Sequence, residues 1–174
     1  FQRLMNVVGE ASGLEFEAYF DEKLKSKIGM DGFWNEGLIF TLYHSSTRSM
    51  ARFGLLALNQ GKWGNEQIVN EAFFKESTTT SQAINPSYGY LWWLNGKSQY
   101  MLPSTQTVFP GMLIPNAPSD LYAAMGAEDQ RIYVIPSKKM VIIRMGKASD
   151  PDNPNFALSG FDQLLWEKIN AVIR

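Results

Sequence analysis

The sequence has no cysteine and only one histidine, His44, among its 174 residues. Without cysteine, the chain can form no disulfide bond, no thiolate nucleophile, no iron–sulfur cluster and no cysteine-ligated zinc site. With one histidine, a Ser-His-Asp relay would have to use His44, and a metal site built from several histidines is excluded. Catalysis by a thiol or by a histidine-rich metal centre is therefore ruled out.

The sequence also lacks an excess of charge of one sign and any long apolar run. Its 16 Lys and Arg nearly balance its 17 Asp and Glu, which leaves a formal net charge of −1 without basic runs. A nucleic-acid-binding or lipid-binding chain would carry a basic patch, and a membrane span needs about 18 apolar residues. We therefore expect no nucleic-acid partner and no membrane span, and a small molecule or another protein as the partner.

What the sequence does contain is material for a packed core. Hydrophobic residues make up 45% of it, and 11 Phe, 7 Tyr and 5 Trp supply large side chains for packing. This composition predicts a folded domain of ordinary size. Because the chain opens on Phe1 and an apolar helical pattern follows almost at once, we expect it to begin inside a larger protein.

Helical periodicity marks residues 1–77, where apolar side chains recur at spacings of three and four. Glycine follows the first three of these patterns and predicts their ends. The predicted helices are residues 4–11, residues 16–28, a helix capped by Ser45 or Ser46 that ends at Gln60-Gly61, and residues 66–76. Residues 31–44 are predicted to be an aromatic-rich loop, and residues 62–65 a tight turn.

Residues 78–174 show strand patterns followed by one helix. The dipeptide Asn95-Gly96 favours a type I′ turn and predicts a hairpin between two of the strands. Four prolines between residues 103 and 118 predict a long surface loop. The predicted strands cover residues 88–94, 97–102, 121–125, 131–135 and 140–145, followed by a polar loop over 150–155 and a closing helix over 161–172. Helices, then an antiparallel meander, then a helix predict the α+β class.

Short motifs of catalysis are absent. The sequence contains no Gly-x-Ser-x-Gly, phosphate loop, His-Glu-x-x-His, Ca²⁺ loop, Ser-x-x-Lys or Tyr-x-Asn. Several carboxylates do lie close together in the first predicted helices, but a charged, solvated helix face explains them better than an acid/base pair. These carboxylates are Glu10, Glu15, Glu17, Asp21 and Glu22.

Longer segments are more specific, because three of them together resemble one family. Residues 47–63, the segment Tyr88-Gly89-Tyr90-Leu91-Trp92-Trp93-Leu94, and residues 123–136 with 140–144 resemble the serine β-lactamase-like hydrolases. This superfamily includes class C β-lactamases, DD-peptidases, esterases and 6-aminohexanoate-oligomer hydrolases. Residues 9–30 are similar to the helix that follows the family's second active-site motif, so the resemblance covers nearly the whole chain in the family's order.

The resemblance implies the C-terminal part of a class C β-lactamase-like (DD-peptidase-like) fold. Residues 1–77 would belong to the helical region, and residues 78–174 would supply antiparallel strands and the C-terminal helix of the α/β region. In the family, the nucleophile and its lysine lie in a Ser-x-x-Lys helix, and a Tyr is the second catalytic group. All three would precede the region that matches Phe1, so this chain would hold no catalytic residue and would be inactive alone.

The same resemblance implies an activity for the intact protein. A serine hydrolase of this type cleaves an ester or amide through an acyl-enzyme, which water then hydrolyses. No metal ion and no organic cofactor is implied, and the partners are the substrate and the upstream part of the same protein. Related enzymes are often exported to the periplasm, so the resemblance alone favours an exported protein.

The resemblance places Ala124, Met125 and Gly126 on the strand of the family's third motif. That strand lines the cleft opposite the serine, and one of its backbone N–H groups forms half of the oxyanion hole. Penicillin-recognising members carry Lys-Thr-Gly or His-Thr-Gly there, and this chain has neither the cation nor the hydroxyl. We therefore expect an ester or a less acidic amide as the substrate, not a β-lactam or D-Ala-D-Ala.

Five further residues are candidates for the cleft. His44 would contact substrate or move a proton, or else be an ordinary loop histidine. Asp129 stands where many relatives have glycine, and its carboxylate is expected to brace the turn before Gln130. Trp92 and Trp93 point in alternate directions if they lie on a strand, so one would pack in the core and the other would either wall the acyl pocket or also pack.

Two other functions remain open from the sequence. A non-catalytic pseudoenzyme or ligand-binding module would keep the fold and use the aromatic cleft to hold a peptide or lipid. A carbohydrate-binding domain would instead expose Trp92 or Trp93 on a flat, open surface. The presence or loss of Ser-x-x-Lys and Tyr-x-Asn upstream separates the enzyme from the pseudoenzyme.

Overall fold

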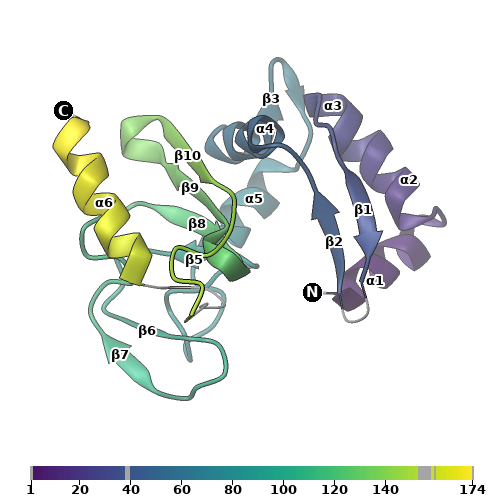
Figure 1. The fold of residues 1–174 in the computed structure, drawn as a ribbon. Helices are drawn as coiled ribbons and strands as arrows, with labels where there is room; N and C mark the ends of the chain where they lie inside the picture. Colours follow the sequence, from purple (N-terminus) through teal and green to yellow (C-terminus); the bar gives the residue numbers. More distant parts are fainter. Residues whose placement is uncertain (1, 38–39, 153–157, 159, 174) are drawn as a thin grey trace.

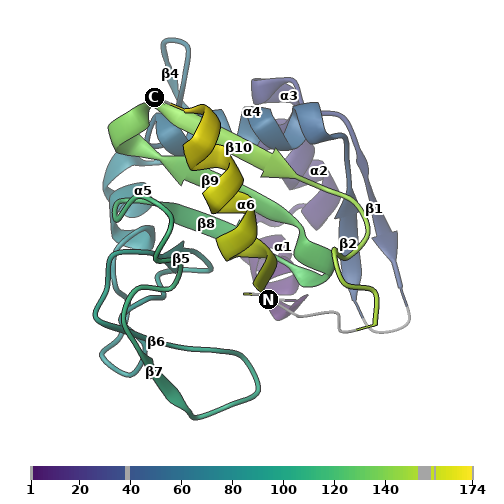
Figure 2. The same cartoon turned by 60° about the vertical axis from the view of Figure 1, so that its left-hand side comes forward.

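The computed structural model describes residues 2–37, 40–152, 158 and 160–173. It confirms the α+β class, with helices and a hairpin in the N-terminal part and an antiparallel sheet with a C-terminal helix in the rest (Figure 1). Helix α6 (Gly160–Val172) covers one face of the sheet, and helix α4 (Thr47–Leu58) packs on the other. Figure 2 shows α6 lying across the sheet strands.

Both helices predicted for the first 28 residues form. Gly13 (φ 69°) and Gly29 (φ 67°) take the left-handed conformation that ends each of them. The helical segments are α1 (Gln2–Ser12), α2 (Phe16–Phe20), the π-helical η1 (Asp21–Lys25) and α3 (Ser26–Ile28). The apolar side of α1 is only partly covered, because Leu4 is 51% and Val7 60% exposed.

The aromatic-rich loop predicted for residues 31–44 is wrong, because this segment forms a hairpin. Strand β1 (Phe33–Glu36) pairs antiparallel with β2 (Thr41–His44). Trp34 lies opposite Tyr43 in this pair, and both rings pack on Phe20 of α2. Each strand is only four residues long, and packing against a helix is what makes so short a hairpin stable.

Helix α4 forms as predicted, and Ser46 is its cap: the Ser46 Oγ accepts a hydrogen bond from the Ser49 N–H at 3.2 Å. The helix predicted over 66–76 is shorter, because α5 spans only Glu71–Ser77 and Asn70 caps it. The residues before Asn70 form a small hairpin of β3 (Lys62–Trp63) and β4 (Glu66–Gln67) around the predicted tight turn.

The main sheet has the strand order β10-β9-β8-β5, and every neighbouring pair is antiparallel. The three C-terminal strands confirm the prediction. The strands are β5 (Trp93–Leu94), β8 (Tyr122–Met125), β9 (Arg131–Ile135) and β10 (Met140–Arg144).

The hairpin predicted at Asn95-Gly96 does not form. Asn95 is 3% exposed, and its amide binds the chain near Ile114: Nδ2 donates to the Ile114 carbonyl and Oδ1 accepts from the Ile114 N–H. The side chain is therefore committed to a buried loop instead of a surface turn. The chain then crosses to a separate hairpin of β6 (Gln99–Met101) and β7 (Val108–Pro110), which projects below the sheet in Figures 1 and 2.

Residues 103–118 are likewise more ordered than the predicted surface loop. They contain β7, and Leu113 and Ile114 are 1% and 0% exposed in the core under α6. Prolines prevent a long helix or strand here without preventing burial. Of the predicted polar loop 150–155, residues 153–155 lie outside the described residues. Among the helices described, none is both long and apolar enough to cross a membrane.

Candidate functional site

The end of strand β8 offers an open edge of the sheet. Strand β5 pairs with β8 only at Ala123 and Tyr122, so within the described chain it does not continue beside Met125. In an antiparallel ladder, successive residues direct their N–H and C=O groups to alternate sides. The Gly126 N–H donates to the Gln130 carbonyl at 3.0 Å, on the β9 side.

This alternation identifies which backbone group is available. Leu121 lies on the opposite side from Gly126, since its carbonyl accepts from the Asn95 N–H at 2.9 Å on the β5 side. Met125 is four residues after Leu121, so its backbone N–H and C=O point to the same side as those of Leu121. The backbone groups of Ala124 point to the same side as those of Gly126. The N–H of Met125 therefore points to the open edge beyond β5, whereas those of Ala124 and Gly126 face β9. Among the three predicted oxyanion residues, Met125 has the suitable geometry.

The turn that follows β8 has an unusual backbone for its sequence. Glu128 (φ 55°) and Asp129 (φ 57°) are both left-handed in the short helix η2 (Ala127–Asp129), although neither is glycine. Such conformations cost on the order of 1 kcal/mol each and need support from their surroundings. Arg144 supplies part of it, because its Nη1 donates to the Glu128 carbonyl at 2.6 Å.

Gln130 and Asp129 connect this turn to the loop that follows β10. The Gln130 Oε1 accepts from the Gly146 N–H at 3.0 Å, and its Nε2 donates back to the Glu128 carbonyl at 3.2 Å. The Asp129 carboxylate, 3% exposed, accepts from the Ser149 N–H and Oγ at 2.9 and 2.7 Å. Both side chains thus brace the turn and are occupied within the protein.

A buried ion network lies beneath the turn. Arg131 is 1% exposed and forms a bidentate pair with Asp162 of α6, with N–O distances of 2.8 and 3.0 Å. The Arg131 Nη2 also contacts the Asp129 carboxylate at 3.1 Å, and Nη1 donates to the Gly126 carbonyl at 2.9 Å. The Arg131 guanidinium therefore connects α6 to both ends of the turn that follows β8.

Tyr133 completes this network from the middle of β9. Its hydroxyl donates a hydrogen bond to the Asp162 carboxylate, and its ring packs on Trp166. Burial, together with the negative charge of Asp162, raises the pKa of Tyr133 above its usual range. The phenol therefore stays protonated and can donate its hydrogen bond to Asp162.

The other predicted cleft residues lie elsewhere. Trp92 and Trp93 are 7% and 6% exposed and pack in the cores on opposite sheet faces. A carbohydrate-binding surface needs an exposed Trp, and the burial of Trp92 and Trp93 excludes both of them from that role. His44 lies at the end of β2, exposed, with its ring stacked on Phe33 of the same hairpin at 5.4 Å.

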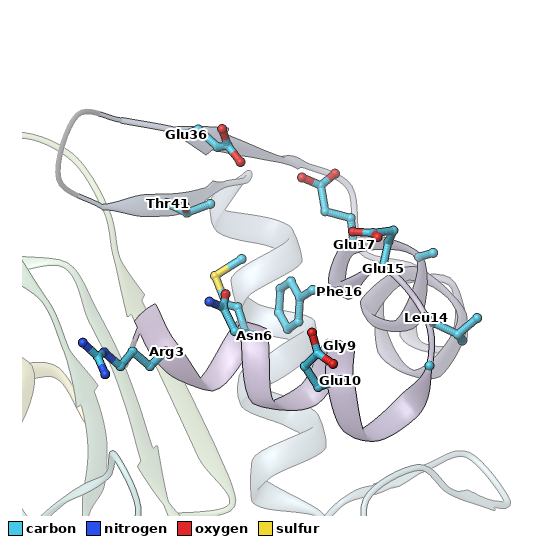
Figure 3. Close-up of a pocket in the computed structure, with 13 residues that line it drawn as sticks. Arg3, Asn6, Gly9, Glu10, Leu14, Glu15, Phe16, Glu17, Glu36 and Thr41 are labelled. Carbon is cyan, nitrogen blue, oxygen red and sulfur yellow. The ribbon is translucent and has the colours of Figure 1, made fainter.

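A large open hollow of about 970 Å³ lies between α1, α2 and the β1–β2 hairpin (Figure 3). Carboxylates surround it, including Glu10 on α1, Glu17 on α2 and Glu36 on β1. Glu10 and Glu17 are exposed, as the sequence predicts for a solvated helix face, and Glu36 is exposed on the hairpin. Within the described chain, no group of three or more His, Cys, Asp or Glu is placed to hold a metal ion.

Sequence reasoning missed the buried network. Arg131 and Asp162 are 31 residues apart, and Asp162 sits in a helix where an acidic residue is ordinarily exposed. The one local signal is an Arg at the start of a strand that otherwise consists of apolar and aromatic residues. Nothing in the sequence pairs that Arg with Asp162.

Comparison with known proteins supports the fold. The sequence matches no protein-family model and no curated protein. Among solved structures, the chain is similar to a Bacillus anthracis protein named as a 6-aminohexanoate-dimer hydrolase, with a TM-score of 0.68 and 19% identity over 98% of the chain. It is also similar to a Bacteroides dorei protein named as a β-lactamase, with a TM-score of 0.61 and 14% identity over 97%.

These similarities confirm that the chain has a β-lactamase-like fold. The alignments cover only 40% of the first structure and 54% of the second. The chain thus corresponds to about half, or less, of the length of these proteins.

Proposed function

We propose that this chain is the C-terminal part of a serine hydrolase that cleaves an ester or amide through an acyl-enzyme. The observation that carries the proposal is the Met125 N–H at the open edge of β8, in a chain with a β-lactamase-like fold. The nucleophilic Ser and its Lys, in a Ser-x-x-Lys helix, and the catalytic Tyr would lie on an upstream segment. This chain would supply the wall of the cleft opposite the serine, with the oxyanion donor on it.

In the proposed chemistry, this chain stabilises the oxyanion and the upstream segment carries the reacting groups. The upstream serine oxygen bonds to the carbonyl carbon, the ester or amide bond breaks, and the serine proton passes through Lys and Tyr to the leaving group. Water then cleaves the acyl-enzyme, which releases the acid and restores the serine. The Met125 N–H would stabilise the oxyanion in both steps, and removing one such donor typically costs about 10²–10³ in kcat.

The turn after β8 supports this task. An oxyanion donor contributes only if it is already in place when charge develops. Arg131 holds the Gly126 carbonyl, next to Met125, through a guanidinium that is itself fixed by Asp162. We propose that this network keeps the end of β8 rigid.

The C-terminal end of β8 carries no charged side chain, which favours an uncharged substrate. Ala124, Met125 and Gly126 at this end carry no charge, so none of them can pair with a substrate carboxylate. An anion placed here would lose water without gaining a partner. We therefore favour a neutral ester or amide.

The exposed apolar side of α1 supports the existence of an upstream partner segment. Leu4 and Val7 lie on one side of α1 and are more than half exposed, as expected if an upstream segment packs against them. In the proposed whole, residues 1–77 complete the helical region and residues 78–174 belong to the α/β region.

The test uses the polypeptide that carries this chain behind its upstream segment. We expect a fluorophosphonate probe to label it and simple esters to be hydrolysed. Met125→Pro removes the proposed oxyanion donor at an unpaired edge, where proline is tolerated, and should lower kcat about 10²–10³-fold. Met125→Leu keeps the N–H and should retain most of the activity. Absence of both labelling and hydrolysis would overturn the proposal.

A further inference from the structure

A second, smaller cavity, which is more open to solvent than the hollow beside α1, lies beside strand β5. It has a volume of about 250 Å³ and lies between residues 84–88, β5 and the segment after β6. Typical ligand pockets measure about 300–1,000 Å³, so this cavity suits one group of a ligand instead of a whole one. Its lining is largely apolar and includes Ile84, Tyr88, Trp93, Met101, Leu102 and Pro103.

Most polar groups around the cavity are already bonded within the protein. The Asn85 amide donates to the Met101 carbonyl at 3.1 Å and accepts from the Met101 N–H at 3.2 Å. The Thr105 hydroxyl is bonded to Thr107, with distances of 3.0 Å to its Oγ1 and its N–H. These groups therefore have little left to offer a ligand.

The Tyr88 hydroxyl differs from them. The described part of the chain gives it no hydrogen-bond partner, and its ring packs edge-on against Trp93 at 4.8 Å. Burial raises the pKa of Tyr88, so the phenol is a neutral donor. A half-buried hydroxyl beside an apolar wall is a donor for a neutral acceptor group.

The cavity lies close to the open edge of β8. Trp93 is paired with Ala123, and Met125 follows two residues later on the same sheet face. Strand residues are spaced about 3.3 Å apart and neighbouring strands about 4.8 Å, so the Cα of Met125 lies about 8 Å from that of Trp93. A short aliphatic chain can bridge this distance.

We propose that this cavity binds the far end of the substrate's acyl chain, with the reacting carbonyl at the Met125 N–H. The inference rests on the proposed function and narrows the substrate to esters or amides of medium-length aliphatic acids. Tyr88 donates a hydrogen bond to a neutral acceptor, such as a ketone or amide carbonyl, near the end of that chain. Among the described residues that line the cavity, none is cationic, so a terminal carboxylate is disfavoured.

The first experiment measures kcat/KM for nitrophenyl acetate, butyrate, hexanoate, octanoate and dodecanoate with the polypeptide that includes the upstream segment. We expect a maximum at hexanoate or octanoate. Leu102→Trp fills the cavity and should lower kcat/KM for hexanoate about tenfold, equivalent to about two buried methylene groups. The acetate value should stay within about twofold. Equal losses for all esters, or no chain-length preference, would overturn the proposal.

A second comparison isolates the hydroxyl. Tyr88→Phe should lower kcat/KM about fivefold for an ester whose acyl chain ends in a methyl ketone, since a hydrogen bond contributes about 0.5–1.5 kcal/mol. The ester with a plain alkyl chain of equal length should be unaffected. An equal effect on both esters would refute the role of Tyr88.

A binding measurement separates this proposal from the proposed function. Saturation-transfer NMR with hexanamide on the 174-residue chain needs no turnover. We expect saturable binding that Leu102→Trp abolishes and that Leu164→Trp, the same substitution at a site 62% exposed on α6, preserves. Binding of hexanamide by this chain, together with no hydrolysis by the polypeptide that includes the upstream segment, would refute the hydrolase and keep the cavity as a ligand site. Hydrolysis without hexanamide binding would refute the cavity alone.

Discussion

The N-terminal part, residues 2–44, and the sheet with α6 bury their side chains very differently. In the sheet part, even charged groups are buried and paired, as Arg131 and Asp162 are. In the N-terminal part, the ion pair of Lys25 and Asp21 is exposed, and Phe33 has 63% of its surface in contact with solvent. The sheet part therefore has an interior of its own, whereas the N-terminal part relies on an aromatic layer and on Ile28 and Met30, which are buried in a cluster with Leu56 of α4.

This contrast has an energetic meaning. A buried ion pair depends strongly on both partners, because loss of one leaves an unpaired charge in the interior. An exposed pair contributes only about 0–1 kcal/mol, since water screens it. The two regions should therefore respond to matched substitutions with very different losses of stability.

The largest effect is expected from Asp162→Asn. The variant keeps the size of the side chain but leaves Arg131 buried without its bidentate partner, so the free energy of unfolding should fall by about 3–5 kcal/mol. Urea denaturation followed by circular dichroism measures this loss. Adding Arg131→Met should recover part of it, because the buried guanidinium that has lost Asp162 is then gone, while Asp129 keeps its hydrogen bonds to Ser149.

Asp21→Asn in the N-terminal part is the matched control. It breaks the exposed pair with Lys25 and should cost less than about 1 kcal/mol. Similar losses for the two Asp variants would show that the regions do not differ as their burial indicates.

An intermediate effect, opposite in sign between the regions, is expected from two helical glycines. An added Cβ at Gly54 of α4 would lie 2.4 Å from the Val141 Cγ1 and 3.3 Å from the Ile132 Cγ2. Gly54→Ala should therefore destabilise the protein by about 1–2 kcal/mol, as the overpacking cost exceeds the gain in helix propensity. At Gly9 of α1, the nearest atom is the Leu14 carbonyl oxygen at 3.4 Å.

Gly9→Ala should accordingly stabilise the protein by up to about 1 kcal/mol. Thermal unfolding of both variants beside the unchanged protein provides the comparison. A stabilising Gly54→Ala would mean that α4 does not pack this tightly on β9 and β10.

The sequence predicts the parts of the fold whose signals are local. The helix around Met50 shows both its periodicity and its cap, and the strands over 131–135 and 140–144 surround a clear turn. The hairpin predicted at Asn95-Gly96 is wrong because turn propensity is a local signal. The Asn95 amide instead donates a hydrogen bond to a carbonyl 19 residues away. The hairpin over 33–44 was missed because its stability comes from Phe20, outside the segment.

The candidate site divides in the same way. The family resemblance indicates the strand with Ala124, Met125 and Gly126, but strand parity requires the partners on both sides of β8. The bracing of that strand by Asp162 depends on where α6 docks, a property of the whole fold. Local patterns thus locate the strand, and only tertiary structure distinguishes the residues on it.

The smallest effect is expected from Asp31, which joins the N-terminal part to α4. Its carboxylate accepts hydrogen bonds from the Ser49 and Ser46 hydroxyls, and these lower the pKa of Asp31. A carboxyl whose pKa is lower in the folded state adds stability above its unfolded pKa of about 3.9 and loses that stability as pH falls through the folded value. Stability should thus fall as the pH drops below about 4.

Asp31→Asn should flatten this pH dependence, so the variant and the unchanged protein should differ less in stability at pH 3 than at pH 7. Urea denaturation from pH 7 to pH 3 measures the effect, with Glu10→Gln on α1 as a control that leaves the contact between Asp31 and α4 intact. If Asp31→Asn leaves the pH profile unchanged, the contact adds nothing measurable. If it equals Asp162→Asn in size, the N-terminal part is as firmly anchored as the sheet, and the contrast between the two regions fails.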